Sequence, residues 1–274
     1  MTEDMPMQVI ARIRNDFSGK FGIPYQSGLV EELKSYIVFE PGFRNADMIR
    51  GLEGFSHIWL LWQFSQSKGW SPMVRPPRLG GNTRIGVLAT RSPFRPSPLG
   101  LSCVKLEQVT PYSRLGPILR VAGADLMNGT PIYDIKPYLP YTDSKPYAEA
   151  GFTATHGHSH LDVDCPEEEL EHLPEDRRAG LLAVLAQDPR PAYQHDPQRI
   201  YGFGFAGFNI RFSVRGSTLT VLDITPNDET APAALDAEYV PQEFDDKLPD
   251  LLENLEFEPF TEDSDPISFD ETDF

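Results

Sequence analysis

The stretch Ser56-His57-Ile58-Trp59-Leu60-Leu61-Trp62-Gln63-Phe64 has five consecutive apolar residues, 58–62, between polar neighbours. Short runs that are rich in aromatic and branched side chains and are bounded by turn residues are typical of β-strands. Gly54 lies just before the stretch and Gly69 lies shortly after it. The stretch therefore predicts a strand, and the segments around it show the same pattern.

The first of these segments alternates apolar Val9, Ala11 and Ile13 with polar side chains. Further strands are predicted over 35–40, 83–90, 101–109, 118–124 and 131–138. Six or seven short strands at close spacing favour a closed or nearly closed antiparallel β-barrel, because closure removes exposed sheet edges. One short helix is expected near residues 47–52. The predicted fold class is mainly β, with an N-terminal barrel domain over residues 1–142 that has no Rossmann fingerprint.

A polar segment, residues 143–160, predicts a linker, and a small α+β domain is expected over residues 161–225. Pro166 followed by three glutamates is typical of a helix start, because acids in the first turn complement the helix dipole. A second helix is predicted over 177–187. Alternating residues at 208–214 and 219–224, separated by Arg215-Gly216, predict a hairpin.

The charge of the chain is concentrated at its C-terminal end. The 274 residues carry a net charge of −17, and residues 226–274 alone hold 17 acids and the single base Lys247. This segment is expected to be a disordered acidic tail, because self-repulsion opposes compaction. It is either a solubilising tail or a peptide that competes with nucleic acid or docks on a partner. The remaining chain is nearly neutral, so nucleic-acid binding is not excluded.

Several classes of protein are disfavoured by the sequence. No apolar run approaches the roughly 20 residues of a membrane-spanning helix, and the first residues are acidic, unlike a signal peptide. Cys103 and Cys165 are too few for a disulfide framework or a cysteine-based zinc site. The histidines at 156, 158 and 160 lie in the polar linker and are not expected to bind metal. His57 is expected to be a core histidine. We therefore expect a cytoplasmic protein without a metal site.

Residues 54–106 contain no acid but seven bases. Such a window predicts an electropositive surface suited to phosphates, and the interleaved Trp70 and Phe94 are side chains on which unpaired bases can stack. Trp59 and Trp62 are expected in the core instead. Two loops in this window, 75–82 and 91–100, combine several prolines with glycine and arginine, as rigid binding loops do.

A third region, residues 125–141, begins with a turn around Asn128-Gly129 and continues into a strand. Asp134 and Lys136 are two residues apart on this strand and so face the same side. The pair is either a simple ion pair or part of a site. An acceptor for an amino group beside the ring of Tyr138 is what an extruded adenine requires.

These regions together resemble the TsaA-like, or TrmO, family of tRNA N6-threonylcarbamoyladenosine methyltransferases. The residues that carry the resemblance are G-L-E-G-F-S-H-I-W at 51–59, R-P-P-R-L-G-G-N at 75–82, R-S-P-F-R-P at 91–96, D-I-K-P-Y at 134–138, D-P-R-P-A-Y at 188–193 and F-N-I-R at 208–211. The resemblance spans roughly residues 7–224. It implies a homodimeric barrel enzyme that uses S-adenosylmethionine to methylate N6 of the modified adenine beside the tRNA anticodon.

The resemblance also implies site residues. Those implied for the methyl donor are Tyr25, Gln26, Ser27, Ser65, Gln66, Arg91, Leu101, Asp125, Leu126, Met127 and Asn128. Three positions depart from the usual family residues: Tyr25 and Ser65 stand where relatives often have Arg and His, and Asn128 stands where Asp is usual. The asparagine keeps an acceptor but lacks the negative charge.

We expect Asp134 to orient the N6 group or accept its proton, Lys136 to hold a substrate carboxylate or phosphate, and Tyr138 to stack on the base. Arg75, Arg78 and Arg95 are expected to grip the backbone of the anticodon loop. Catalysis would then consist mostly of positioning. Two other functions remain open, an RNA-binding module without catalysis and a regulatory protein that senses S-adenosylmethionine.

Overall fold

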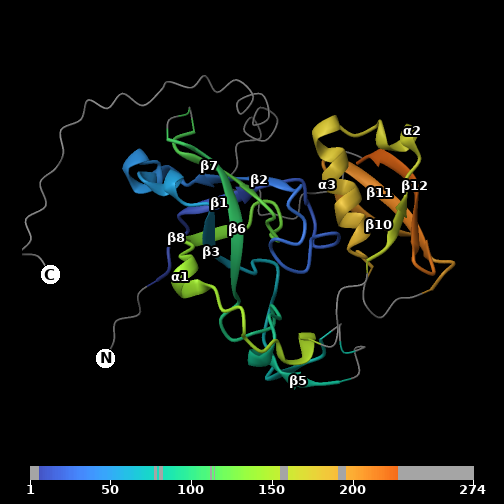
Figure 1. The fold of residues 1–274 in the computed structure, drawn as a ribbon, viewed down its shortest axis with the longest axis horizontal. Coiled ribbons are helices and arrows are strands. Elements are labelled where there is room, and N and C mark those ends of the chain that lie inside the picture. The colour runs from blue at the N-terminus through green and yellow to red at the C-terminus, as the bar shows by residue number, and fades with distance from the viewer. Residues whose placement is uncertain are drawn as a thin grey trace, which may run out of the picture. The chain divides into compact units, whose positions relative to one another are not determined.

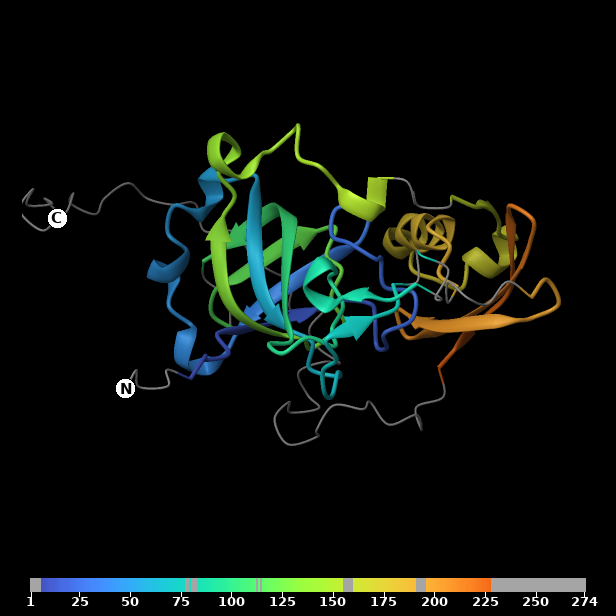
Figure 2. The same ribbon diagram turned by 90° about the horizontal axis from the view of Figure 1, so that it is seen from below.

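The computed structural model describes residues 6–76, 79, 83–111, 113, 115–154, 160–190 and 196–227. Six antiparallel strands form a closed barrel in the order β1-β2-β7-β6-β3-β8 (Figures 1 and 2). They are β1 (Ala11–Arg14), β2 (Lys34–Phe39), β3 (His57–Gln63), β6 (Leu99–Thr110), β7 (Ile118–Ala122) and β8 (Pro131–Pro137). The predicted antiparallel barrel is confirmed.

Strand β3 shows how the sequence places its two faces. Ile58, Leu60 and Trp62 are buried inside the barrel, whereas the residues between them are only half-buried on the outer wall. Trp62 is 6% exposed and lies in the core as predicted, but the prediction is wrong for Trp59. The two tryptophans are three residues apart, so a strand of period two directs them to opposite faces.

His57 also lies on the outer face, because it has the same parity as Trp59 along β3. Its Nδ1 atom is 3.0 Å from the hydroxyl of Ser56. The expectation of a core histidine at position 57 is therefore wrong.

The connection between β3 and β6 is a long excursion, residues 64–98. The strand predicted over 83–90 is reduced to β5 (Ile85–Gly86), which pairs only with β4 (Met73–Val74). A 3₁₀ turn, η5 (Val87–Ala89), follows directly. The predicted binding loop 91–100 belongs to this excursion, whereas residues 77, 78 and 80–82 of the other predicted loop lie outside the described residues.

The helix expected near residues 47–52 is also replaced by 3₁₀ turns. Turn η1 (Pro41–Phe43) is followed by η2 (Ala46–Ile49) and η3 (Leu52–Gly54). Gly51 separates the last two with a φ of +84°, a left-handed conformation that ends a helix. The polar segment after the barrel contains the single helical turn α1 (Pro140–Asp143) and the 3₁₀ turn η6 (Gly151–Ala154).

The C-terminal part contains two helices and a four-stranded sheet. The helices are α2 (Glu167–Leu170) and α3 (Glu175–Ala186), and the sheet has the order β10-β11-β12-β9. Its strands are β9 (Asp162–Asp164), β10 (Tyr201–Phe205), β11 (Phe208–Arg215) and β12 (Thr218–Pro226). The predicted hairpin is β11 with β12. Among the described residues, no helix is long and apolar enough to cross a membrane. The acidic tail lies outside the described residues.

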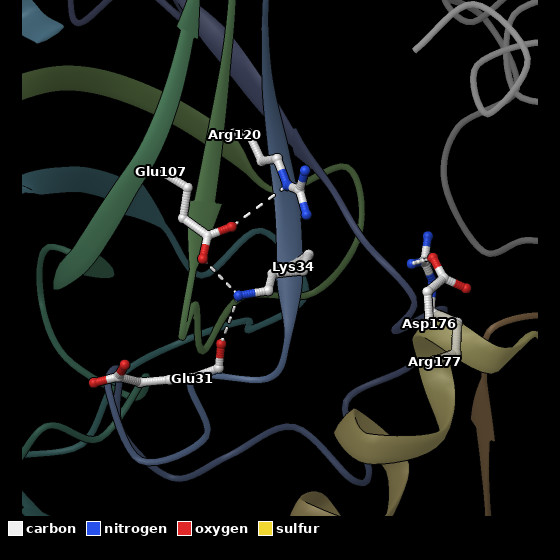
Figure 3. A network of polar contacts seen from close by, with 6 residues as sticks. All are labelled: Glu31, Lys34, Glu107, Arg120, Asp176 and Arg177. Atoms are coloured by element: carbon white, nitrogen blue, oxygen red, sulfur yellow. Dashed lines mark hydrogen bonds and ion pairs between the residues drawn. The ribbon is translucent and has the colours of Figure 1, made fainter. Parts of the chain in front are cut away.

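The N-terminal segment shares a core with this C-terminal sheet. Phe17 and Leu33 pack in one buried cluster with Leu181 of α3 and Phe205 of β10, and the rings of Phe17 and Phe205 meet edge to face at 5.4 Å. Arg177 of α3 forms an ion pair with Asp16 at 3.0 Å. Arg177 also pairs with the adjacent Asp176, and Figure 3 shows these two side chains. The residues after β1 are therefore held by the C-terminal part as well as by the barrel.

A charged network fastens three strands on the outer wall of the barrel. Lys34 of β2 contacts Glu107 of β6 at 2.6 Å and donates to the carbonyl of Glu31 at 3.1 Å (Figure 3). Glu107 also pairs with Arg120 of β7 at 3.4 Å. Partly exposed pairs of this kind contribute little each, and their main effect is to fix the register of the strands.

The contact between Gly100 and Trp62 gives a test of the barrel core. A Cβ on Gly100 would lie 2.2 Å from an indole carbon of Trp62, directly across from it on β3. Overpacking of this kind costs about 1–3 kcal/mol. We expect Gly100→Ala to lower the melting temperature by roughly 2–10 °C, measured by circular dichroism. Gly54→Ala is the control, because its Cβ would meet open space; equal melting temperatures would contradict the packing.

Candidate functional site

Two loops lie side by side at the centre of the candidate site, residues 25–28 and residues 123–129. The backbone amide of Gly28 donates to the carbonyl of Gly123 at 2.8 Å. Gly123 has a φ of +75°, and a Cβ there would lie 3.2 Å from the backbone of Gly28. Glycine is therefore required for this close approach. It brings the backbone amide of Ser27 to the carboxylate of Asp125.

Asp125 is the most strongly held polar residue of the site. The hydroxyl of Ser102 donates to its Oδ1 at 2.5 Å, and the indole nitrogen of Trp62 donates to the same hydroxyl at 2.9 Å. Burial raises the pKa of the Asp125 carboxyl, while the hydrogen bonds from Ser102 and Ser27 and the charge of Arg91 oppose the rise. A chain of hydrogen bonds thus runs from the barrel interior to this carboxylate.

Arg91 approaches the same loops from the excursion between β3 and β6. Its guanidinium donates to the side-chain oxygen of Gln26, and its charge also acts on Asp125. The structure therefore brings together Gln26, Ser27, Arg91 and Asp125, which are separated by up to 99 positions in the sequence. These are four of the residues that the resemblance implies for the methyl donor.

The turn after Asp125 serves mainly to hold the backbone. Leu126 is completely buried in the barrel core, and its carbonyl accepts from the side chain of Asn15 at 2.7 Å. The Asn128 oxygen accepts from the backbone amide of Asn15 at 3.2 Å, so the acceptor expected for a ligand is used within the protein. Met127 is half-buried, and its carbonyl accepts from the hydroxyl of Thr130 at 2.7 Å.

The remaining residues that the resemblance implies for the methyl donor are exposed. Tyr25 is exposed, and its hydroxyl donates to the carbonyl of Arg190 at 3.2 Å, which links the first loop to the C-terminal part. Ser65 and Gln66 are exposed residues that follow β3. Leu101 is exposed on the outer wall, one residue before the buried Ser102.

The three residues expected to be catalytic lie on or just after β8. Asp134 and Lys136 form an exposed ion pair at 2.9 Å, and the carboxylate also accepts from the amide of Ile135. The ring of Tyr138 lies 5.9 Å from that of Trp59 and 6.1 Å from that of His57. The predicted shared face of Asp134 and Lys136 is present.

Strand register relates these residues to the donor centre. Leu61 of β3 lies opposite Asp134 on one side and opposite Leu101 on the other. Directly opposed residues are about 5 Å apart, so Asp134 and Leu101 lie on one outer face about 10 Å from each other. Asp134 therefore shares an outer face with Leu101, one of the residues that the resemblance implies for the methyl donor.

Trp59 and Asp143 were not expected in the site. The indole nitrogen of Trp59 donates to Asp143 at 2.9 Å, and the amide of Leu139 donates to the same oxygen at 3.0 Å. These two hydrogen bonds lower the pKa of the Asp143 carboxyl, with the amide of Leu139 contributing most. The contact fixes the ring of Trp59 beside Tyr138.

Two of the three arginines expected to bind RNA lie among the described residues. Arg75 is exposed after β4, and Arg95 is half-buried, with its guanidinium donating to the carbonyl of Thr90 at 3.1 Å. Arg78 lies outside the described residues, as do His156 and His158. In the part of the chain that the structure describes, no group of three or more His, Cys, Asp or Glu side chains could hold a metal ion.

Ser102 is another site residue that sequence reasoning missed. It occupies an inward position of β6 between Gly100 and Val104, where an apolar side chain is usual. A lone hydroxyl on the apolar face of a strand must find a partner, and this is the signal that could have identified it. Its partner, Asp125, is 23 residues away, beyond the reach of local patterns.

Comparison with known proteins agrees with this geometry. The N-terminal domain of tRNA-methyltransferase O matches residues 12–144, and the TrmO C-terminal domain matches residues 159–227. The tRNA (adenine(37)-N6)-methyltransferase of Escherichia coli K12 is 40% identical over 227 residues, covering 79% of this chain and 96% of that protein. Its counterpart from Eikenella corrodens is 47% identical over 163 residues, covering 58% of this chain and 91% of that protein.

Two further similarities come from Pseudomonas aeruginosa. A protein named putative S-adenosylmethionine-dependent methyltransferase RcsF is 37% identical, covering 80% of this chain and 97% of that protein. A crystal structure of TrmO superimposes with a TM-score of 0.68 at 31% identity, covering 82% of this chain and 99% of that chain. Both TrmO domains are present in order, and relatives are matched over nearly their whole length. The chain therefore belongs to the TrmO family.

Proposed function

We propose that the chain is an S-adenosylmethionine-dependent tRNA methyltransferase that methylates N6 of N6-threonylcarbamoyladenosine at position 37, in the anticodon loop. Relatives matched over nearly their whole length carry the name tRNA (adenine(37)-N6)-methyltransferase. The observation that carries the proposal is the convergence of Gln26, Arg91 and Asp125, in a chain that also presents Asp134 on the outer face of β8. The proposal also includes a homodimeric state and a location in the cytoplasm, where tRNA is used.

The donor centre has the chemistry that S-adenosylmethionine requires. This molecule carries a cationic sulfonium, ribose hydroxyls, and an amino acid end with a carboxylate. The carboxylate of Asp125 can accept hydrogen bonds and attract positive charge, and the guanidinium of Arg91 can pair with a carboxylate. Ser102 fixes the orientation of Asp125 from inside the barrel. The residues present therefore fit the donor.

When bound, S-adenosylmethionine would supply a methyl group on a sulfonium sulfur, and the methyl–sulfur bond would break with the neutral thioether as the leaving group. Asp134 orients the N6–H and accepts its proton as the new nitrogen–carbon bond forms. Lys136 holds the carboxylate of the threonyl group, and Tyr138 stacks on the base beside Trp59. Arg75, Arg78 and Arg95 position the phosphates of the loop. The chain thus contributes mainly binding and orientation, which can supply a large part of a rate enhancement.

The test is methyl transfer from labelled S-adenosylmethionine to two tRNA pools, one with threonylcarbamoyladenosine and one without it. Nucleoside mass spectrometry identifies the product. We expect label only in the pool that carries the modification. Label in both pools would contradict the assigned substrate, and donor binding without transfer to either pool would favour a sensor of S-adenosylmethionine.

A further inference from the structure

The excursion between β3 and β6 exposes two large aromatic side chains that the proposed chemistry does not use. Trp70 is 60% exposed and Phe94 is 48% exposed. The amide of Ser71 donates to the carbonyl of Phe94 at 3.2 Å, so the segments that carry the two rings lie side by side. Figure 2 shows this excursion, which includes β4 and β5, at the end of the barrel where β3 ends and β6 begins.

These rings belong to an exposed apolar patch. Met73 of β4 is 46% exposed, and Leu88 of η5 is 78% exposed. The carbonyl of Pro72 accepts from the amide of Val87 at 3.0 Å, which holds the two segments together. Several large apolar side chains exposed on neighbouring segments of one excursion favour an interaction surface.

Charge indicates what covers the patch. The sequence from 54 to 106 has no acid, and Arg75 and Arg84 are exposed and form no ion pair with the described residues. A second copy placed symmetrically on this surface would bring like charges together. A single-stranded nucleic acid instead supplies phosphates for the arginines and flat bases for the aromatic rings. The surface therefore favours RNA.

The loop that carries Phe94 also reaches the donor centre. Arg91, three residues before Phe94, contacts Gln26. At the other end of the same loop, the carbonyl of Pro98 accepts from the amide of Phe64, which directly follows β3. A nucleotide stacked on Phe94 would thus be near the base that receives the methyl group.

We propose that Trp70 and Phe94 form a stacking platform for unpaired nucleotides that flank the target adenine in the anticodon loop. The inference rests on the proposed function and adds the residues that keep nucleotides of the anticodon loop unpaired by stacking on them. The rings act on binding of the loop, whereas transfer itself depends on β8.

The test compares Trp70→Ala, Phe94→Ala and the double variant with Tyr147→Ala, whose ring is 98% exposed outside the patch. Affinity is measured for an anticodon stem-loop and for a fully paired RNA of equal length. Stacking contributes about 1–3 kcal/mol per base, so each patch variant should bind the stem-loop about ten-fold more weakly. Affinity for the paired RNA and for S-adenosylmethionine should change less than two-fold, as should all affinities of Tyr147→Ala.

Arg75→Ala separates stacking from phosphate binding. It should weaken both RNAs alike and reduce the salt dependence of binding, because a phosphate contact does not distinguish paired from unpaired RNA. Sedimentation of every variant measures its oligomeric state and so tests the alternative that a second copy of the chain covers the patch. If the patch variants dissociate a dimer, or bind the stem-loop as well as Tyr147→Ala does, the platform is contradicted. Failure of the wild-type protein to methylate modified tRNA would instead contradict the proposed function.

Discussion

Asp134→Asn is expected to lower kcat for methyl transfer about 100-fold or more while leaving the protein folded. The change keeps the shape of the side chain and removes the carboxylate that is proposed to accept the N6 proton. Loss of a positioned base costs about 10²–10⁴-fold in rate. The ion pair of Asp134 with Lys136 is exposed, so its loss changes stability by less than about 1 kcal/mol.

The measurement is single-turnover transfer at saturating donor over a range of tRNA concentrations, which separates the rate at saturation from the dependence on tRNA, together with the melting temperature. Lys136→Ala should act mainly on tRNA binding and raise KM, because the proposal assigns its ammonium to a carboxylate of the substrate rather than to the reacting nitrogen. Asp47→Asn is the matched control, since Asp47 also forms an exposed ion pair, with Arg50. If both site variants stay within about ten-fold of the wild-type rate, Asp134 and Lys136 are structural.

The barrel could be predicted from sequence because its strands carry strong local signals. Strands such as β3 and β6 alternate buried and exposed side chains over seven or more residues. Strand β10 could not be predicted, because its sequence YGFGF alternates aromatic residues with glycine, a residue disfavoured in strands. The strand predicted over 83–90 is wrong for the opposite reason, because a strand-like pattern is present there but most of the segment does not form a strand. Its apolar residues turn into η5 after Gly86, and the only partner of β5 is the two-residue β4.

The site was predictable only as a set of residues, not as an arrangement. Motif resemblance selected Gln26, Arg91 and Asp125, but only the fold places them in contact. Ser102 and Asp143 were missed because each acts through long-range hydrogen bonds, Ser102 to Asp125 and from Trp62, and Asp143 from Trp59. The hydrogen bond from the backbone amide of Asn15 to the side-chain oxygen of Asn128 could not be predicted for the same reason. Local patterns carry no information on such pairs.

Asp125→Asn is expected to weaken S-adenosylmethionine binding about ten- to hundred-fold, measured by calorimetry at pH 7.5. The amide can still accept from Ser102 but loses the negative charge, and a hydrogen bond to a charged group is worth about 1.5–3 kcal/mol. Glu107→Gln is the control, because it removes a half-buried carboxylate of the barrel wall outside the donor centre. Equal donor affinity of Asp125→Asn and wild type would exclude Asp125 from the donor site.

The pH dependence of the same pair of proteins tests the burial of Asp125. Because burial raises its folded pKa above the usual 3.8, the native state takes up a proton before the unfolded state does as the pH falls. This residue therefore adds stability as the pH falls from the raised pKa toward 3.8, and none above that window. The free energy of unfolding of wild type relative to Asp125→Asn should rise across that window. Wild-type donor affinity should fall there, whereas that of the variant should stay level. Protonation thus relieves the cost of burying the carboxylate and removes the charge that is proposed to bind the donor, so a rise in stability and a loss of donor affinity are expected in the same pH window.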